Sequence, residues 1–187
     1  VKDFPSAERL VKVSKSCVRV ARLFGFDPKV AFLSHSTFGN PVSKNTKHVR
    51  DAIDLLKKEK VDFDFDGEMQ PDVALKPVHQ EIYPFSNTVG NANILIMPAL
   101  HSAAISTKLM KVFGGGKLIG PLLIGLGLPI EVAPLRASTS EILNLASIAS
   151  YSSDVAAMFC SKCSKNTTAV SLSLSLSLSL SLSLSLS

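Results

Sequence analysis

VAFLSHSTFGNPVSKNTKHVRDAIDLLKKEKVDFDFD, residues 30–66, is the stretch of sequence that decides the fold. Its apolar start, residues 30–33, has the length of a short buried strand, and a polar loop, residues 34–41, follows. Apolar side chains then recur at steps of three and four, which predicts a helix; they are Val49, Ala52, Ile53 and Leu56. Residues 61–66 alternate apolar and acidic side chains and predict a second strand. Strand, loop, helix and strand in this order are typical of a parallel sheet.

The flanking sequence repeats this alternation of helix and strand. Residues 6–24 predict an amphipathic helix that ends at Gly25 and carries Cys17 on its buried stripe. Further strands are expected at residues 93–98, 118–124 and 130–133, and further helices at residues 101–113 and from Ser138 to about Asp154. Together these elements predict an α/β fold of three layers, in which helices cover both faces of a mainly parallel sheet.

Ligands of such sheets bind where the strands end at their carboxyl termini. This rule selects the loop at residues 34–41, which contains Ser36, and the segment at residues 133–141, which contains Arg136, Ser138 and Glu141. It also selects the segments that follow Phe65 and Met97. We expect any small-molecule site at these positions.

The charge of the chain is modest and uneven. Twenty basic and 15 acidic residues give a net charge of +5, and residues 1–60 hold 13 of the basic and six of the acidic groups. A basic region suits an anionic ligand such as a phosphate, although solvated helix faces also account for it. Tyr83 and Tyr151 are isolated and Trp is absent, so nucleic-acid binding is not expected.

Targeting signals are missing from the sequence as given. Its three cysteines do not make a disulfide framework, and its start lacks the pattern of a signal peptide. Two prolines interrupt the most apolar stretch, residues 118–130, so no membrane segment is expected. These features predict a cytoplasmic protein, and the first residue, Val1, suggests a fragment.

Three motifs of cofactor and metal sites are incomplete. GGGKL at residues 114–118 lacks the Ser or Thr that follows Lys in a phosphate loop, and GLGLPI at residues 125–130 lacks the third glycine of a dinucleotide fingerprint. Cys160 and Cys163 form a lone Cys-x-x-Cys with no histidine near it in the sequence. No metal and no nucleotide cofactor are therefore expected.

The segment before the last helix has two interpretations. Ser138 and Glu141 have the spacing of a capping box, in which each side chain satisfies a backbone amide of the other residue. A helix N-terminus beside Arg136 is also suited to binding a phosphate. The capping box and the phosphate site can coexist.

Four separated blocks resemble the phosphate acetyl/butyryltransferase family. They are DGEMQPDVAL at residues 66–75, NILIMPAL at residues 93–100, GPLLIGLGLPIEV at residues 120–132 and EILNLA at residues 141–146. The resemblance extends from Phe4 to about Asp154, so we expect the second half of a transferase-like domain at residues 1–154. It implies a phosphate acetyltransferase or isocitrate dehydrogenase-like fold, truncated here.

Two further stretches, YPFS at residues 83–86 and FGNP at residues 38–41, most resemble the domain fused to the C-terminus of hybrid NADP-dependent malic enzymes. That resemblance implies that this part binds acetyl-CoA, or a related acyl-CoA or phosphate ligand, as a regulator and helps to form a homo-oligomer. NADP and a divalent metal would belong to the absent malic part.

Catalytic members of the family carry Ser-Arg, then glycine, then an Asp followed by Ile. Aligned without gaps on Glu141 and Ile142, these positions hold Pro134, Leu135 and Glu141, and Arg136 is one residue out of register. Losing the Ser and the Arg removes transition-state stabilisation, so acetyl transfer is not expected. Whether the chain is an enzyme stays open, since a fragment of a phosphate acetyltransferase and a product without function are the alternatives.

The end of the sequence is of low complexity. Residues 155–170 form a junction that matches nothing in the family, and residues 171–187 alternate Ser and Leu without interruption. A dinucleotide repeat of C and T encodes this alternation, so we interpret the tail as a translated genomic repeat or a gene-model artefact. As a real segment it would be disordered or a self-pairing strand.

Overall fold

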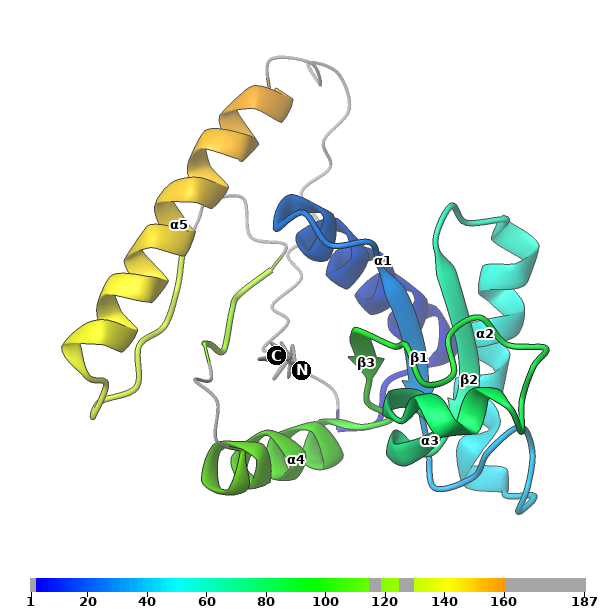
Figure 1. Cartoon of the computed structure of the whole chain (residues 1–187). Coiled ribbons are helices and arrows are strands. Elements are labelled where there is room, and N and C mark those ends of the chain that lie inside the picture. Colours follow the sequence, from blue (N-terminus) through cyan, green and yellow to red (C-terminus); the bar gives the residue numbers. More distant parts are fainter. Residues whose placement is uncertain (1–2, 115–118, 125–129, 161–187) are drawn as a thin grey trace.

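The computed structural model describes residues 3–114, 119–124 and 130–160, with side chains as far as residue 151. The helices are α1 (Ala7–Leu23), α2 (Lys47–Glu59), α3 (Pro71–Leu75), α4 (Leu100–Phe113) and α5 (Thr139–Cys160). The strands are β1 (Lys29–Leu33), β2 (Asp64–Met69) and β3 (Ile94–Ile96). Two short 3-10 helices, Lys44–Thr46 and Pro77–Gln80, complete the fold (Figure 1).

The three strands form one parallel sheet in the order β2-β1-β3. The central strand β1 places Val30 beside Phe65 of β2 and beside Ile94 of β3. Asn93 ties the start of β1 to β3, because its side chain accepts from the Lys29 amide at 2.8 Å and donates to the Asp27 carbonyl at 2.6 Å. The expected parallel sheet is thus confirmed.

Helices cover both faces of this sheet. On one face, α1 and α2 pack on alternate residues of the strands, including Val30, Phe32 and Ile94. On the other face, α3 and the following segment cover Ala31, Leu33 and Leu95. The alternation of side chains along each strand sends successive residues into different cores. The sequence prediction of an α/β fold with helices on both faces is therefore confirmed.

Helical periodicity identified most of the buried residues of α1 and α2, although Phe24, at the end of the predicted α1 stripe, is 38% exposed. Cys17 lies in the first core, where burial raises the pKa of its thiol to about 12. The predicted stripe of α2, from Val49 to Leu56, is buried against the sheet. Strand β2 begins at Asp64, later than the alternating pattern suggests, but Val61, Phe63 and Phe65 still pack against the first core.

The two later strands do not form. Residues 119–123 and 130–133 are irregular, although Ile124 makes an isolated bridge. Pro121 has no backbone amide to give to a strand ladder, which accounts for the first failure. The last helix, in contrast, continues past Asp154 to Cys160, since residues 155–160 contain no Gly or Pro.

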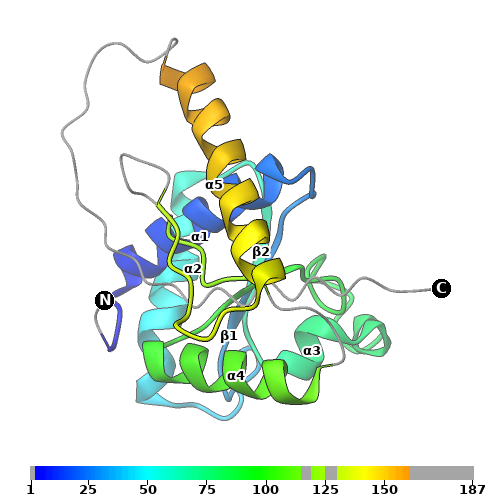
Figure 2. The same cartoon turned by 90° about the vertical axis from the view of Figure 1, so that its left-hand side faces the viewer.

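Helices α4 and α5 lie at the periphery. Figure 1 shows α5 on the side away from the sheet, and both views place α4 along another edge of the molecule (Figures 1 and 2). One contact reaches back from α5, where the Tyr151 hydroxyl donates to the Leu23 carbonyl at 3.5 Å. In the part of the chain that the structure describes, no helix is long and apolar enough to span a membrane.

Candidate functional site

A largely buried polar cluster lies where β1 and β2 end at their carboxyl termini. We call it the carboxyl-end cluster, and its members are Ser34, Ser36, Arg50 and Glu68. The Ser36 hydroxyl donates to Glu68 Oε1 at 2.9 Å, and Arg50 Nη1 donates to the same oxygen at 3.1 Å. Arg50 also donates to the Ser43 carbonyl at 3.1 Å, so one guanidinium joins α2, the loop after β1 and the end of β2.

An irregularity in β2 turns Glu68 toward α2. Gly67 pairs with Phe32 and Met69 pairs with Leu33, which leaves Glu68 as one extra residue between two registered pairs. Gly67 has φ +145°, and a Cβ atom there would lie 2.7 Å from the Phe32 carbonyl oxygen. Only glycine fits this close approach, so Gly67 permits the displacement that brings Glu68 to Arg50.

Glu68 is a fully buried carboxylate with an incomplete set of partners. Its side chain is 0% exposed, whereas that of Arg50 is 36% exposed. Oε2 of Glu68 is buried and accepts no hydrogen bond from the described residues. Arg50 provides the balancing charge, because an unpaired charge at this depth would be strongly destabilising.

The loop after β1 is held against this cluster in a tight turn. Thr37 and Asn40 exchange backbone hydrogen bonds of 2.9 and 3.0 Å, and the Phe38 amide donates to the Glu68 carbonyl at 2.7 Å. Phe38 has φ +47°, a left-handed conformation that costs energy for a residue with a Cβ atom. The Phe38 ring is partly buried and packs against the second core.

Phe38 packs on two aromatic residues from a distant part of the chain. Its ring centroid lies 5.3 Å from that of Tyr83 and 5.0 Å from that of Phe85. The FGNP and YPFS stretches, on which the malic-type resemblance depends, therefore contact each other beside the second core.

The start of α5 has the geometry of a capping box. The Ser138 amide donates to Glu141 Oε2 at 2.7 Å, and the Glu141 amide donates to the Ser138 hydroxyl at 3.3 Å. Lys111 of α4 adds an ion pair with Glu141 at 3.4 Å. The hydrogen bonds from Ser138, followed by Lys111, hold the pKa of Glu141 below its usual value. The capping interpretation is confirmed, and the phosphate interpretation stays a prediction.

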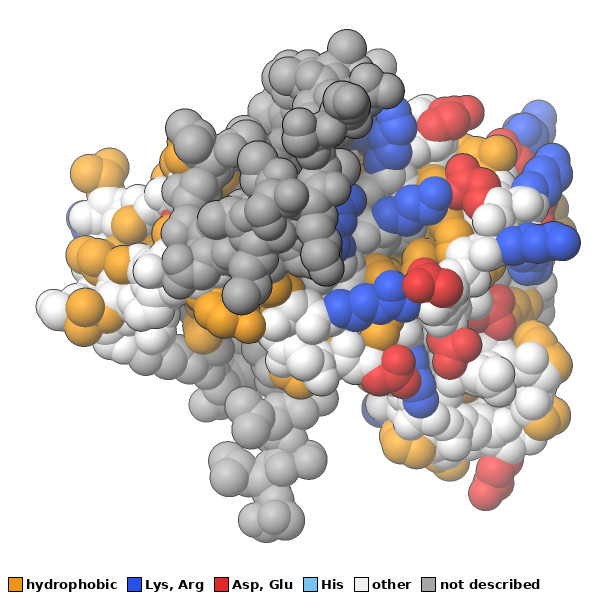
Figure 3. Space-filling view, turned by 90° about the horizontal axis from the view of Figure 1, so that it is seen from above, with side chains coloured by type: hydrophobic (Ala, Val, Ile, Leu, Met, Phe, Trp, Pro, Cys, Tyr) orange, Lys and Arg blue, Asp and Glu red, His pale blue; other side chains and the backbone are white. Residues whose placement is uncertain are grey.

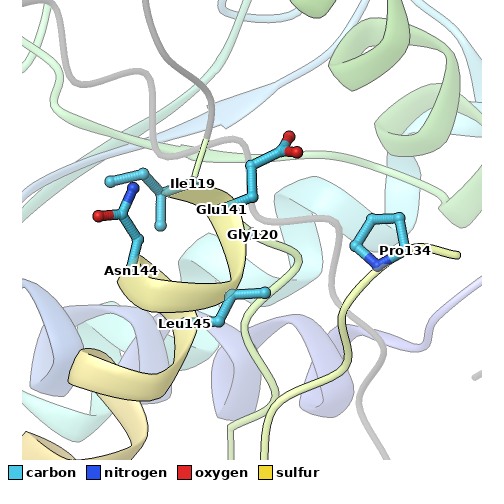
Figure 4. Close-up of a pocket in the computed structure, with 6 residues that line it drawn as sticks. All are labelled: Ile119, Gly120, Pro134, Glu141, Asn144 and Leu145. Atoms are coloured by element: carbon cyan, nitrogen blue, oxygen red, sulfur yellow. The ribbon is translucent and has the colours of Figure 1, made fainter. Parts of the chain in front are cut away.

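A turn precedes the capping box. The Ala137 amide donates to the Pro134 carbonyl at 2.9 Å, which places Leu135 and Arg136 at the tip, where both are exposed. Arg136 makes no hydrogen bond or ion pair with another residue that the structure describes. A small pocket adjoins this turn and is lined by Ile119, Gly120, Pro134, Glu141, Asn144 and Leu145 (Figure 4).

The family model for phosphate acetyl/butaryl transferase matches residues 1–150. This match covers most of the chain and includes both places just described. The chain belongs to the phosphate acetyl/butaryl transferase family.

Relatives named as malic enzymes and relatives named as phosphate acetyltransferases share this transferase-like domain. An NADP-dependent malic enzyme of Rhizobium meliloti is 44% identical over 151 residues, which are 81% of this chain and 20% of the relative. A phosphate acetyltransferase of Bacillus subtilis is 32% identical over 145 residues, which are 77% of this chain and 45% of the relative. The chain therefore spans less than half the length of either relative.

A solved structure agrees with the family assignment. A phosphotransacetylase from Streptococcus pyogenes superposes with a TM-score of 0.77 at 31% identity, covering 83% of this chain and 47% of that one. The transferase-like fold is thus shared over the part that both chains contain.

The structure separates the predicted site residues of this transferase-like chain. Ser36 is buried in the carboxyl-end cluster, so its role in ligand binding stays a prediction. Arg136, Ser138 and Glu141 lie together, but the start of α5 is on the opposite side of the molecule from α3 and the end of β2 (Figure 1). The two places do not share one site within the part described.

Sequence reasoning missed Glu68 and Arg50. The available signal was a carboxylate between Gly67 and Met69 at the end of a strand, where a charge needs a partner. No group of three or more His, Cys, Asp and Glu side chains that could hold a metal occurs among the residues described. Cys163 of the Cys-x-x-Cys pair, most of both glycine motifs and the Ser-Leu tail lie outside them.

Proposed function

We propose that this chain is a regulatory, acyl-CoA-binding and oligomer-forming part of a cytoplasmic malic enzyme and is not itself an acetyltransferase. One observation carries the proposal. Pro134 and Leu135 occupy the positions where catalytic members of the family carry Ser and Arg, and Leu135 points into solvent at the tip of its turn. Neither side chain can hydrogen-bond a thiol or a phosphate.

The relatives support the malic enzyme context. Identity to the Rhizobium meliloti malic enzyme exceeds identity to the Bacillus subtilis phosphate acetyltransferase, at similar coverage of this chain. Malate, NADP and a divalent metal would be handled by a separate malic part. Residues 1–154 would provide the transferase-like part.

Binding of an acyl-CoA phosphate is proposed at the α5 start. Arg136 offers an exposed guanidinium next to a helix N-terminus, which attracts anions. Glu141 is occupied by the capping box and by Lys111, so its negative charge is partly balanced. The proposal is supported by the pocket that Pro134 and Glu141 both line, since both are at positions that are catalytic in other members of the family.

Calorimetric titration with acetyl-CoA tests the binding site. Arg136→Ala should weaken binding by about 1 to 3 kcal/mol, the range for a charge-assisted hydrogen bond. Arg19→Ala, which removes an exposed guanidinium from α1, is the matched control and should leave affinity unchanged. If Arg136→Ala binds like the wild type, the site lies elsewhere, and the loop after β1 becomes the next candidate.

The second candidate function is that of a phosphate acetyltransferase represented by a fragment. The match to the Bacillus subtilis enzyme over 45% of its length favours it. Sequencing the gene upstream of the codon for Val1 distinguishes the two. A malate-binding and NADP-binding region there supports the regulatory proposal, and the first half of a transferase domain with no malic part supports the enzyme.

A further inference from the structure

The segment between α3 and β3 exposes large apolar side chains. Val78, Ile82 and Phe85 are 63%, 61% and 69% exposed, and we call these three residues the 78–85 surface. In residues 77–86 the sequence has one Asp, Glu, Lys or Arg, which is Glu81. An exposed patch that is apolar and nearly free of charge is typical of a site that contacts another protein surface.

Backbone hydrogen bonds hold this segment on α3. The Tyr83 amide donates to the His79 carbonyl at 3.0 Å, and the Gly90 amide donates to the Val73 carbonyl at 2.9 Å. A Cβ atom at Gly90 would lie 2.7 Å from the Cα atom of Pro77, so the end of the segment packs directly on its start. The exposed side chains therefore lie on a backbone that is fixed to the rest of the fold.

Three aromatic rings join the 78–85 surface to the loop after β1. The ring centroid of Phe85 lies 5.0 Å from that of Phe38 and 6.0 Å from that of Tyr83. Phe38 and Tyr83 pack on the second core, whereas Phe85 is mostly exposed. The FGNP and YPFS stretches, which carry the malic-type resemblance, therefore meet where this surface is open.

We propose that the 78–85 surface is the docking site for the malic part of the same polypeptide. The inference rests on the proposed function, which places this chain in a malic enzyme. The match covers 20% of the Rhizobium meliloti malic enzyme and 45% of the Bacillus subtilis phosphate acetyltransferase, so a larger share of the malic relative lies outside it. A surface built from the malic-type stretches fits an occupant that belongs to the malic relatives. The remainder of a transferase fold would be common to both kinds of relative.

The residues of the surface define the chemistry of the occupant. Phe85 is an exposed ring supported by two others, so we expect an apolar recess on the malic part that receives it. Glu81 is exposed at the edge of the surface, where we expect a Lys or Arg of the malic part to lie opposite it.

Photo-cross-linking in the complete natural polypeptide tests the proposal. With p-benzoylphenylalanine in place of Phe85, irradiation should join position 85 to peptides of the malic part, which mass spectrometry of a digest identifies. The same replacement at Phe113 of α4, which is 80% exposed, is the matched control and should give no such product. Malate oxidation by each preparation shows that its malic part is present and folded.

The same cross-linker at Ile82 keeps the test decisive if the change at Phe85 prevents folding. Adding Val78→Glu to that protein should lower the yield of the product about tenfold, as for a central interface residue. Val112→Glu, which places the same charge on an exposed valine of α4, should leave the yield unchanged.

The proposal is overturned if neither position joins the malic part in a polypeptide that oxidises malate. Products with a second copy, or with the remainder of the transferase fold, would then identify the true occupant. A wild-type polypeptide that does not oxidise malate would contradict the proposed function itself, and with it this inference.

Discussion

The part of the chain from α1 to β3 and the part from α4 to α5 differ sharply in how they bury apolar side chains. Among the residues described, only three buried apolar residues, Ala99, Ala103 and Leu145, come after Ile96. All the others belong to the two cores around the sheet. Viewed from above, charged side chains gather on the side of α1 and α2, whereas hydrophobic side chains are exposed on the side of α5 (Figure 3).

The two parts therefore differ in how far they can bury their apolar side chains within this chain. The first part places a central apolar strand between two layers of helices, which satisfies its hydrophobic faces within one chain. The second part has regular helices but, among its described residues, no strand for them to cover, since residues 119–123 and 130–133 are irregular. We therefore expect the first part to dominate stability and the second to carry binding and assembly.

A pair of leucine substitutions should show the largest contrast. Leu56 of α2 is 0% exposed in the first core, whereas Leu143 of α5 is 62% exposed. Leu56→Ala should lower the free energy of unfolding by about 3 kcal/mol, through lost burial and a cavity. Leu143→Ala should change it by less than about 0.5 kcal/mol. Urea unfolding of both variants measures the difference, and equal losses would contradict the division into two parts.

The carboxyl-end cluster should give the next largest effect. Arg50→Met keeps most of the aliphatic stem but leaves Glu68 as a buried unpaired charge, and should cost about 2 kcal/mol. This value is below that for a fully buried pair because Arg50 is partly exposed. The double variant Arg50→Met, Glu68→Gln removes both charges and should recover at least half of the loss. No recovery in urea unfolding would mean that the pair is not coupled.

Local patterns predicted most of the first part. Steps of three and four identified the buried faces of α1 and α2, and apolar runs identified β1 and β3, because these signals depend on near neighbours in sequence. The Ser138 and Glu141 capping box was predictable for the same reason.

Features that depend on distant partners were not predictable. Arg50 meets Glu68 only because Gly67 lets one extra residue enter β2, and no periodic pattern reports such an irregularity. The strand expected at residues 118–124 had the right apolar composition, but Pro121 cannot donate to a ladder. The contact of Phe38 with Tyr83 and Phe85 was likewise not predictable, because these residues are far apart in the sequence.

A smaller effect is expected at the start of α5. Ser138→Ala removes the hydroxyl that accepts from the Glu141 amide, and should lower stability by about 1 kcal/mol as a lost cap. Affinity for acetyl-CoA should change little, in contrast to Arg136→Ala. Thermal melts together with calorimetric titration separate the two roles, and a large loss of affinity in Ser138→Ala would show that the hydroxyl binds the ligand.

The pH dependence of this cap should be the smallest effect. The pKa of Glu141 is lowered in the folded chain, so its stabilisation is present above the unfolded value of about 4.3 and is lost as the pH falls through the folded value. Glu141→Gln removes the charge. Melts of the two proteins should differ at neutral pH and converge in acid, and a difference that persists in acid would contradict this assignment.

The central claim, that the second part binds an acyl-CoA without transferring its acetyl group, is tested most directly by one combined measurement. The complete natural polypeptide that contains this sequence is titrated with acetyl-CoA, and the same preparation is assayed for acetyl phosphate formation from acetyl-CoA and phosphate. We predict saturable binding and no acetyl phosphate above the background without protein, because Pro134 and Leu135 replace the Ser and Arg of catalytic members. Sustained formation of acetyl phosphate would contradict the account.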